Sequence, residues 1–353
     1  LKRYRRKIMD KEFKKAFSGM SFLVCGGCGF MGSNFIHYLF KMIPGVTVVN
    51  ADLLTFAGNK NNLKDIPKRR YRFIRADIAD EKKMKRLMKS ADYVVNFAAE
   101  THVDRSIHHH AGSFLHSNVI GVEALLKALQ SSSRVSKMVH ISTDEVWGDL
   151  SLDSKKKFNE ESPFRPNSPY AASKAAADLL IRSFVKTYGL PVIVSHSVNN
   201  FGPRQFPEKL IPFFYLRLSQ GKTLPLYGDG KNVRDWIHVD DHTRAILTLL
   251  LKGVPGDVFA ISRGEEYSNI EIAKKLLKAM KKPASLITFV KDRPGHDRRY
   301  SVDCARIRRL GWKPKYSLKQ ELQKTIQWYQ KNSAWLADVV RRQPGINTHI
   351  RIT

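Results

Sequence analysis

Short apolar runs alternate with amphipathic segments over the first two hundred residues. The runs of strand length are Met20–Val24, Val46–Ala51, Tyr71–Ile74, Tyr93–Phe97 and Met138–Ile141. The segments with helical periodicity between them are Phe35–Met42, Glu81–Lys89 and Phe114–Leu129. Strands that alternate with helices predict a parallel sheet covered on both faces. We therefore predict an α/β fold, a doubly wound parallel sheet of Rossmann type.

The pattern changes after residue 200, where segments shorten and Pro and Gly become frequent. We predict a basic extension over 1–19, a Rossmann domain over 20–200 and a smaller C-terminal substrate-binding lobe over 201–333, with 239–263 returning to the first domain. The tail over 334–353 carries no functional signal. No apolar run approaches the ~20 residues of a membrane-spanning helix, and the N-terminus lacks the apolar stretch of a secretory signal. We expect a cytoplasmic protein without membrane contact.

Glycines follow the first predicted strand at positions 26, 29 and 32 and lead into a predicted helix. Gly26 permits the tight turn, Gly29 lets backbone approach a pyrophosphate, and Gly32 allows helix and strand to pack. The helix N-terminus then binds the phosphates. Asp52 follows the second strand, where its carboxylate accepts hydrogen bonds from the adenosine ribose and repels a 2′-phosphate. This pattern predicts bound NAD rather than NADP, although Asp52 alone is also typical of a simple turn.

A tyrosine and a lysine stand four residues apart, at Tyr170 and Lys174, on a predicted helix that runs to Tyr188. A nearby ammonium lowers a phenol's pKa, so we expect Tyr170 to take a proton from a sugar hydroxyl while hydride leaves the same carbon. Thr143 ends a buried strand and is placed to orient that hydroxyl. Asp144 and Glu145 follow it. They are either polar loop residues or an acid and a base whose environments separate their pKa values.

These motifs resemble the extended short-chain dehydrogenase/reductases and, within them, the dTDP-glucose 4,6-dehydratases. The resemblance covers Phe22 to Trp312. It rests on segments Asp52–Asn59, Asn96–Ile107, Ser142–Gly148, Asn199–Pro212, Tyr227–Trp236 and Asp292–Tyr300. Epimerases of the same fold usually lack the acidic pair, so Asp144 and Glu145 favour the dehydratase branch.

The resemblance implies a lyase that oxidises the sugar at C4, eliminates water across C5 and C6, and returns the hydride to C6. Tyr170 would be the base for the 4-hydroxyl, Glu145 the base for the 5-proton, and Asp144 the acid for the departing 6-hydroxyl. The alternatives are a UDP-glucose or other nucleotide-sugar dehydratase, and, disfavoured by the acidic pair, an epimerase or decarboxylase. The resemblance also implies a homodimer formed through the Phe114 and Tyr170 helices.

The family's binding residues are carried over by motif. The residues expected at the cofactor, besides the three glycines, Tyr170 and Lys174, are Phe30, Met31, Asp52, Asp77, Ile78 and Ala98. The residues expected at the nucleotide-sugar substrate are Thr101, His102, Asn200, Lys209, Pro225, Tyr227, Arg234, Asn269, His296 and Tyr300. Among these, Asn200 and Arg234 would hold the diphosphate. Two departures from the family pattern are Trp147 in place of tyrosine and Ser197–Val198 in place of Cys-Ser.

Net charge and cysteines leave two other hypotheses to weigh. The formal charge of +29 supports an alternative hypothesis, that the chain is a non-catalytic nucleic-acid-binding or NAD-sensing protein. The basic residues are spread along the chain and match no nucleic-acid-binding motif, so a solvated cationic surface is favoured. Cys25 and Cys28 form a C-x-x-C spacing, but it lies inside the glycine loop, which favours buried thiols over a redox pair or zinc site. Consecutive histidines at 108–110 point in different directions on a helix, so no metal site is expected.

Overall fold

The computed structural model describes residues 2–108, 111–343, 345–347 and 350. Its centre is a seven-stranded sheet in the order β10-β6-β5-β4-β1-β2-β3, and every neighbouring pair is parallel. The strands are β1 (Ser21–Cys25), β2 (Thr47–Asp52), β3 (Tyr71–Arg75), β4 (Tyr93–Asn96), β5 (Lys137–Thr143), β6 (Val192–Ser197) and β10 (Val258–Ile261). The predicted fold class is confirmed.

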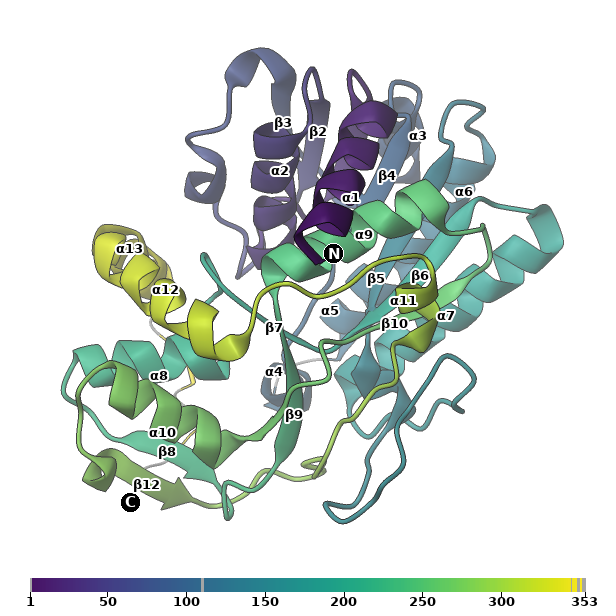
Figure 1. The fold of residues 1–353 in the computed structure, drawn as a ribbon. Coiled ribbons are helices and arrows are strands. Elements are labelled where there is room, and N and C mark those ends of the chain that lie inside the picture. The colour runs from purple at the N-terminus through teal and green to yellow at the C-terminus, as the bar shows by residue number, and fades with distance from the viewer. Residues whose placement is uncertain (1, 109–110, 344, 348–349, 351–353) are drawn as a thin grey trace.

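Helices cover both faces of this sheet (Figure 1). One apolar core lies under α1 (Lys2–Phe17), α2 (Phe30–Met42) and α9 (Val239–Lys252). The other lies under α3 (Glu81–Met88), α6 (Gly121–Gln130) and α7 (Pro169–Tyr188). The amphipathic segment predicted over Phe114–Leu129 is interrupted, because α5 (Gly112–Leu115) passes through a π-helical turn, His116–Ile120, before α6 begins.

The basic N-terminal extension is part of the first core rather than a free arm. Phe13 and Phe17 of α1 are buried, and Asp10 pairs with Arg244 of α9. A second ion pair joins Glu12 to Lys252 across the same two helices, at 2.8 Å. Apolar burial and ion pairs of this kind fix a helix to its neighbour, and α1 and α9 lie side by side in Figure 1.

A smaller lobe is built from residues after 198. It contains β7 (Asn199–Phe201), β9 (Val233–His238) and β11 (Glu266–Ser268) in one sheet, and β8 (Leu224–Tyr227) paired with β12 (Ile287–Val290) in another. The helices α8 (Leu210–Ser219), α10 (Asn269–Ala279) and α12 (Leu318–Lys331) enclose its own apolar core. Short helices α4 (Val103–His108) and α11 (Ala305–Arg309) lie nearer the first domain.

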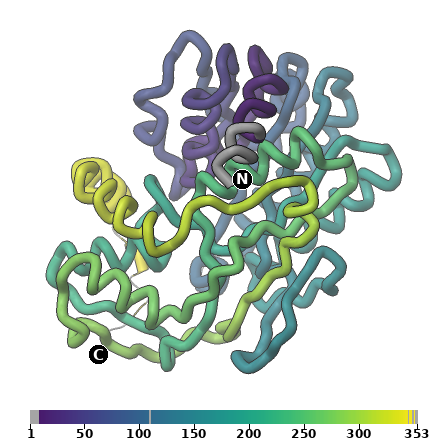
Figure 2. The backbone as a smooth tube through the Cα atoms, viewed as in Figure 1, coloured from purple at the N-terminus to yellow at the C-terminus, as the bar shows by residue number. Residues whose placement is uncertain are grey.

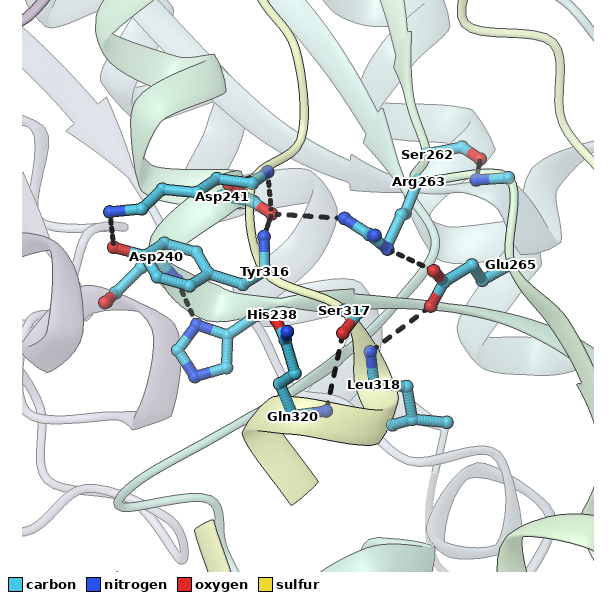
Figure 3. Close-up of polar contacts among 12 residues, drawn as sticks. His238, Asp240, Asp241, Ser262, Arg263, Glu265, Tyr316, Ser317, Leu318 and Gln320 are labelled. Atoms are coloured by element: carbon cyan, nitrogen blue, oxygen red, sulfur yellow. Dashed lines mark hydrogen bonds and ion pairs between the residues drawn. The ribbon is translucent and has the colours of Figure 1, made fainter. Parts of the chain in front are cut away.

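Asp241, in the first turn of α9, ties the late chain to the first domain (Figure 3). Its buried carboxylate accepts hydrogen bonds from the backbone N–H groups of Lys315 and Tyr316, at 2.7 and 2.8 Å. Its own carbonyl accepts from the Trp312 indole. These bonds hold the segment that crosses from α11 to α12 in the foreground of Figure 2. A charge-assisted bond to a buried N–H is among the stronger ones in proteins.

The tail also makes defined contacts. Helix α13 (Ser333–Arg342) packs on α12, and the Trp335 indole donates to Asn62 Oδ1 at 2.7 Å. Asn347 donates to the Glu208 carbonyl at 3.0 Å. No helix within the described ranges has the length and apolar character needed to span a bilayer. The expected cytoplasmic location stays a prediction.

Candidate active site

The glycine loop joins β1 to α2, and its three glycines differ in the space around them. Gly26 has a φ of 75°, and a Cβ there would lie 2.5 Å from the Ala98 nitrogen. A Cβ on Gly32 would lie 2.4 Å from the Gly26 carbonyl oxygen. Gly29 has a φ of −76°, and its nearest neighbour would be 3.4 Å away. The protein itself therefore requires Gly26 and Gly32, whereas Gly29 leaves space at a helix N-terminus suited to a phosphate.

Asp52 organises this loop from the end of β2. It is 7% exposed, and its carboxylate accepts the N–H of Cys28 at 2.8 Å and of Leu54 at 2.7 Å. Burial raises the pKa of Asp52, and these two N–H groups oppose the rise. Each carboxylate oxygen retains a lone pair, so the side chain has capacity for ribose hydroxyls.

A pocket at this edge of the sheet collects most of the residues expected at the cofactor. Gly26, Gly29, Asp52, Asp77, Ile78 and Ala98 line it. Phe30, Met31 and Gly32 begin α2 and are outside the lining. Thr101, expected near the sugar, lines this pocket instead. Asp77 also contacts the His116 ring at 2.8 Å, which fixes the carboxylate at the pocket rim.

The expected catalytic side chains come from the end of β5 and from the first turns of α7. Thr143 is the last residue of β5, and its hydroxyl lies 3.4 Å from Asp144 Oδ1. Ser168 caps α7 by accepting the Ala171 N–H, which sets the direction of the turn that carries Tyr170. Lys174, one turn later, is buried against β5 and donates to the Ile141 carbonyl at 2.7 Å.

The expected lowering of the phenol's pKa is wrong. Burial raises the pKa of Tyr170, the negative charge of Glu145 adds to the rise, and a hydrogen bond with Thr143 opposes it. The Lys174 amine is engaged elsewhere, with the Ile141 carbonyl and with His140 Nε2 at 3.1 Å. Burial also lowers the pKa of Lys174 to about 8, so the amine keeps most of its charge at neutral pH and loses it as the pH rises through that value.

Asp144 and Glu145 lie in different environments. Burial raises the pKa of Asp144 well above its usual range, and the charge of Glu145 raises it further. The pKa of Glu145 is also raised by burial, but the positive charges of Arg293, Lys209 and Arg234 oppose that rise. The described residues leave Asp144 Oδ2 without a hydrogen-bond partner. Asp144 therefore keeps its proton to a higher pH than Glu145, which suits Asp144 to act as the acid and Glu145 as the base.

A second pocket lies between the two lobes and includes Glu145. The expected substrate residues that line it are His102, Lys209, Pro225, Tyr227, Arg234, Asn269, His296 and Tyr300. Arg234 lies with its guanidinium 4.1 Å from the centre of the Tyr300 ring. His102 adopts a φ of 84°, a conformation that non-glycine residues take at a cost of about 1–3 kcal/mol. The pocket thus joins cationic side chains, aromatic rings and Glu145 of the acidic pair.

One substrate residue expected from sequence and one departure from the family pattern lie outside both pockets. Asn200 is outside the pocket lining, because its amide turns back to donate to Ser197 Oγ and the Val198 carbonyl; Asn199 lines the pocket instead. Trp147 lines neither pocket. It is buried behind the site, with its ring 4.7 Å from that of His196, so it does not shape the substrate side.

Several charged pocket residues were missed by the motif reasoning. Arg293 pairs with Asp104 at 2.7 Å, and both line the substrate pocket. Glu208 lines it too, and burial raises its pKa to about 7. Arg293 and Glu208 lie inside Asp292–Tyr300 and Asn199–Pro212, two of the segments on which the family resemblance rests. A charged residue within such a segment was the sequence signal that could have predicted their place in the pocket. Asn347 lines the pocket from the tail, and nothing in its sequence pattern predicted this.

The cysteines are buried thiols, as the glycine loop favoured. Burial raises the pKa of both Cys25 and Cys28 to about 12, which leaves them unreactive near neutral pH. Within the described part of the chain, no cluster of three or more His, Cys, Asp or Glu side chains is placed to hold a metal ion. Two of the three consecutive histidines, at 109 and 110, lie outside the described residues.

The fold and these two pockets define a dinucleotide-binding enzyme of the short-chain dehydrogenase/reductase class, with its Tyr-x-x-x-Lys pair beside the sheet's carboxyl edge. The chain belongs to the GDP-mannose 4,6 dehydratase family, whose sequence model matches residues 23–325.

Individual relatives agree with this placement. A dTDP-glucose 4,6-dehydratase of Streptomyces niveus is 45% identical over 324 residues, which cover 90% of this chain and 94% of the relative. The dTDP-glucose 4,6-dehydratase DesIV from Streptomyces venezuelae, crystallised with NAD bound, has a TM-score of 0.86 at 44% identity; the match covers 91% of this chain and 100% of that one. A UDP-glucose 4-epimerase of Thermotoga maritima has a TM-score of 0.81 at 29% identity, over 89% of this chain and 100% of the epimerase.

The glycine geometry predicts separable effects on folding and on binding. Gly29→Ala should change the free energy of unfolding by less than about 1 kcal/mol yet weaken NAD binding at least about tenfold, or 1.4 kcal/mol. Gly32→Ala forces backbone atoms apart and should cost about 2 kcal/mol or more of stability. Urea unfolding and titration with NAD measure the two quantities. Unchanged NAD affinity in Gly29→Ala would contradict the assignment of Gly29 to the pyrophosphate.

Proposed function

We propose that the protein is a dTDP-glucose 4,6-dehydratase, a hydro-lyase that uses NAD and forms dTDP-4-keto-6-deoxyglucose. The observation that carries this proposal is the pair Asp144 and Glu145, whose environments favour one protonated and one ionised carboxyl beside Tyr170. Alcohol oxidation needs only a base and its cation, whereas water elimination needs an additional acid and base. The names of the Streptomyces niveus and Streptomyces venezuelae relatives supply dTDP-glucose as the substrate.

Three residues would handle the hydroxyl at C4. Thr143 orients it, and Tyr170 takes its proton as the C–H bond at C4 breaks. Lys174 supports the tyrosine from the next turn of α7. NAD, when bound, accepts the hydride and returns it, so no reductant is consumed. Gly29, Asp52 and the other residues of the first pocket would hold it.

The acidic pair would then eliminate water. A carbonyl at C4 makes the proton at C5 acidic, and Glu145 would remove it, since the positive charges of Arg293, Lys209 and Arg234 oppose the effect of its burial. Asp144, protonated because it is buried beside Glu145, would give its proton to the departing 6-hydroxyl. The proton removed and the proton given balance, and water leaves.

The substrate pocket offers matching chemistry for a nucleoside diphosphate sugar. Lys209 and Arg234 would bind the diphosphate, and Tyr227 and Pro225 would contact the base. Arg234 lines the pocket, and two of its nitrogens donate to the carbonyls of Val233 and Asp297. UDP-glucose is the second candidate substrate, because the same groups bind any pyrimidine nucleoside diphosphate.

Incubation with dTDP-glucose, without added reductant, tests the proposed reaction. We expect a product lighter than the substrate by one water and carrying a 4-keto group, detected by mass spectrometry. UDP-glucose serves as the matched comparison. Turnover of UDP-glucose alone would reassign the base, and turnover of neither, with tight and salt-sensitive nucleic-acid binding instead, would favour the non-catalytic hypothesis.

Substitution of the acidic pair should separate oxidation from elimination. Asp144→Asn and Glu145→Gln should each lower the rate of water loss by about 10²–10⁴-fold while bound NAD is still reduced by the substrate. Nicotinamide absorbance in a single turnover measures the first step, and product mass the second. Tyr170→Phe is the matched control and should lose both steps. Equal loss of both steps in Glu145→Gln would contradict its role as the base at C5.

A homodimer through the helices around Phe114 and Tyr170 is part of the proposal. The segments α5, the π-helical turn and α7 pack together, and they expose Leu115, Ile120 and Leu179 at 53, 50 and 56%. Exposed large apolar side chains on adjoining helices are typical of an interface. Leu179→Glu should convert a dimer to a monomer in sedimentation experiments. Val254→Glu, at a residue 63% exposed elsewhere, should not, and a monomeric parent protein would refute the interface.

A further inference from the structure

The loop that follows β2 forms a solvent-facing wall of the first pocket, in which Gly29 and Asp52 would hold NAD. Leu53 and Thr55 line this pocket and are exposed, so the loop lies at the pocket's rim. Phe56 lines the pocket from the same loop and is half-buried. The contacts that hold Phe56 in place therefore decide how firmly this wall is closed.

The two ends of this loop are fixed by hydrogen bonds within the first domain. The N–H of Leu54 donates to Asp52 Oδ1 at 2.7 Å. The N–H of Asn59 donates to the Cys28 carbonyl at 3.0 Å. Phe56 lies between these two points and belongs to no helix or strand. Its ring is therefore placed by side-chain contacts rather than by regular secondary structure.

Arg105 and Phe206 contact the Phe56 ring from two other parts of the chain. The guanidinium of Arg105, on α4, lies over the ring with its carbon 3.4 Å from the ring centre. Phe206, in the second lobe before α8, meets the ring at 85° with the two ring centres 5.4 Å apart. A cation over an aromatic face and an edge-to-face pair of rings are both attractive geometries. These three side chains, named here the aromatic clasp, join the loop to α4 and to the second lobe.

A buried carboxylate orients Arg105. Its Nη1 donates to Glu100 Oε2 at 3.0 Å, and the Glu100 side chain is only 7% exposed. Asn118, fully buried in the π-helical turn, holds Glu100 in turn. Asn118 Oδ1 accepts the Glu100 N–H at 2.9 Å, and Asn118 Nδ2 donates to the Glu100 carbonyl at 3.0 Å. Because Glu100 already orders the guanidinium, stacking on Phe56 costs Arg105 little further side-chain entropy.

Neither Arg105 nor Phe206 lines either pocket. Phe206 is uncharged, so its route to a bound cofactor is through the Phe56 ring. Arg105 has a second route, because its positive charge attracts the cofactor's diphosphate from a distance. The two routes differ in a measurable way: an effect that passes through the ring disappears once the ring is removed, whereas attraction by charge persists.

We propose that Arg105 and Phe206 are positioning residues that hold Phe56 at the wall of the cofactor pocket and thereby slow the release of NAD. The consequence for catalysis rests on the proposed function. A hydride that leaves C4 and returns to C6 needs the same cofactor molecule in both steps. Release of the cofactor between those steps would leave the sugar oxidised at C4 without a hydride donor, so the clasp would keep the cycle intact.

Exchange of bound NAD tests the clasp without any turnover. The full chain is loaded with isotopically labelled NAD and mixed with excess unlabelled NAD, and the retained label is followed by rapid filtration. Arg105→Gln, Phe206→Leu and Phe56→Leu should each raise the dissociation rate about three- to tenfold. An unchanged rate in any folded variant of the three would overturn the proposal. The Arg105 side chain is 26% exposed, so Arg105→Gln remains a test if the buried Phe206→Leu variant fails to fold.

A double-mutant cycle separates the ring contact from attraction by charge. In the Phe56→Leu background, Arg105→Gln should change the dissociation rate by less than about twofold, because its route through the ring is gone. A further increase as large as that in the parent background would give Arg105 a direct electrostatic role and overturn its place in the clasp.

The matched control is Arg306→Gln. Arg306 also lies over an aromatic ring, that of Phe259 at 5.1 Å, and pairs with Asp257 at 2.6 Å, but none of the three lines either pocket. Its NAD exchange should match that of the parent protein, and an acceleration equal to that of Arg105→Gln would overturn the proposal. If the parent protein turns over no sugar nucleotide, the proposed function fails, while the exchange measurement still decides whether the clasp retains NAD.

Discussion

The parallel pairing of β1 with β4 and of β4 with β5 is the interaction on which the site depends. Its register sets Cys25 opposite Asn96 and Asn96 opposite His140. The glycine loop, the backbone at Ala98 and the Thr143 turn therefore leave the sheet side by side at its carboxyl edge. Because side chains alternate along a strand, a slip of one residue would send His140 to the opposite face and remove it from Lys174. The glycine loop and the turn after Thr143 are thus held next to each other by the same set of backbone hydrogen bonds between strands.

The second lobe completes the chemistry by supplying charge. Arg234 on β9 and Arg293 after β12 stand close enough to Glu145 to oppose the effect of its burial, whereas Asp144 is affected mainly by burial and by Glu145 itself. The lobe is held to the first domain by β9, which leads directly into α9, and by the bonds to Asp241. The difference between the two carboxyls is therefore a property of the packing between lobes, since neither strand β5 nor the acidic pair alone produces it.

Much of this was predictable from sequence, and the exceptions have physical reasons. Hydrophobic periodicity predicted the parallel sheet, and the spacing of the glycines and Asp52 predicted the glycine loop. Both features depend on residues that are close together along the chain. The side-chain direction of Asn200 and the packing of α1 depend on partners far away in sequence, which periodicity does not reveal. The electrostatics of Tyr170 was predicted wrongly because a spacing of four places a lysine near a phenol without saying what else its amine contacts. Here the Ile141 carbonyl and His140 engage it.

That error shows how burial affects the charge of the catalytic lysine, Lys174. A lysine buried in a protein either finds enough acceptors to remain charged or gives up its proton. Lys174 donates to one carbonyl and lies 3.1 Å from His140 Nε2, while the carboxylate of Asp178, whose charge favours the ammonium, also accepts from Ser142 and contacts His196. The phenol in turn is buried beside Glu145, which disfavours a second negative charge. Burial thus disfavours the charged form of both groups, lowering the pKa of Lys174 and raising that of Tyr170, so spacing along the helix alone does not fix their charges.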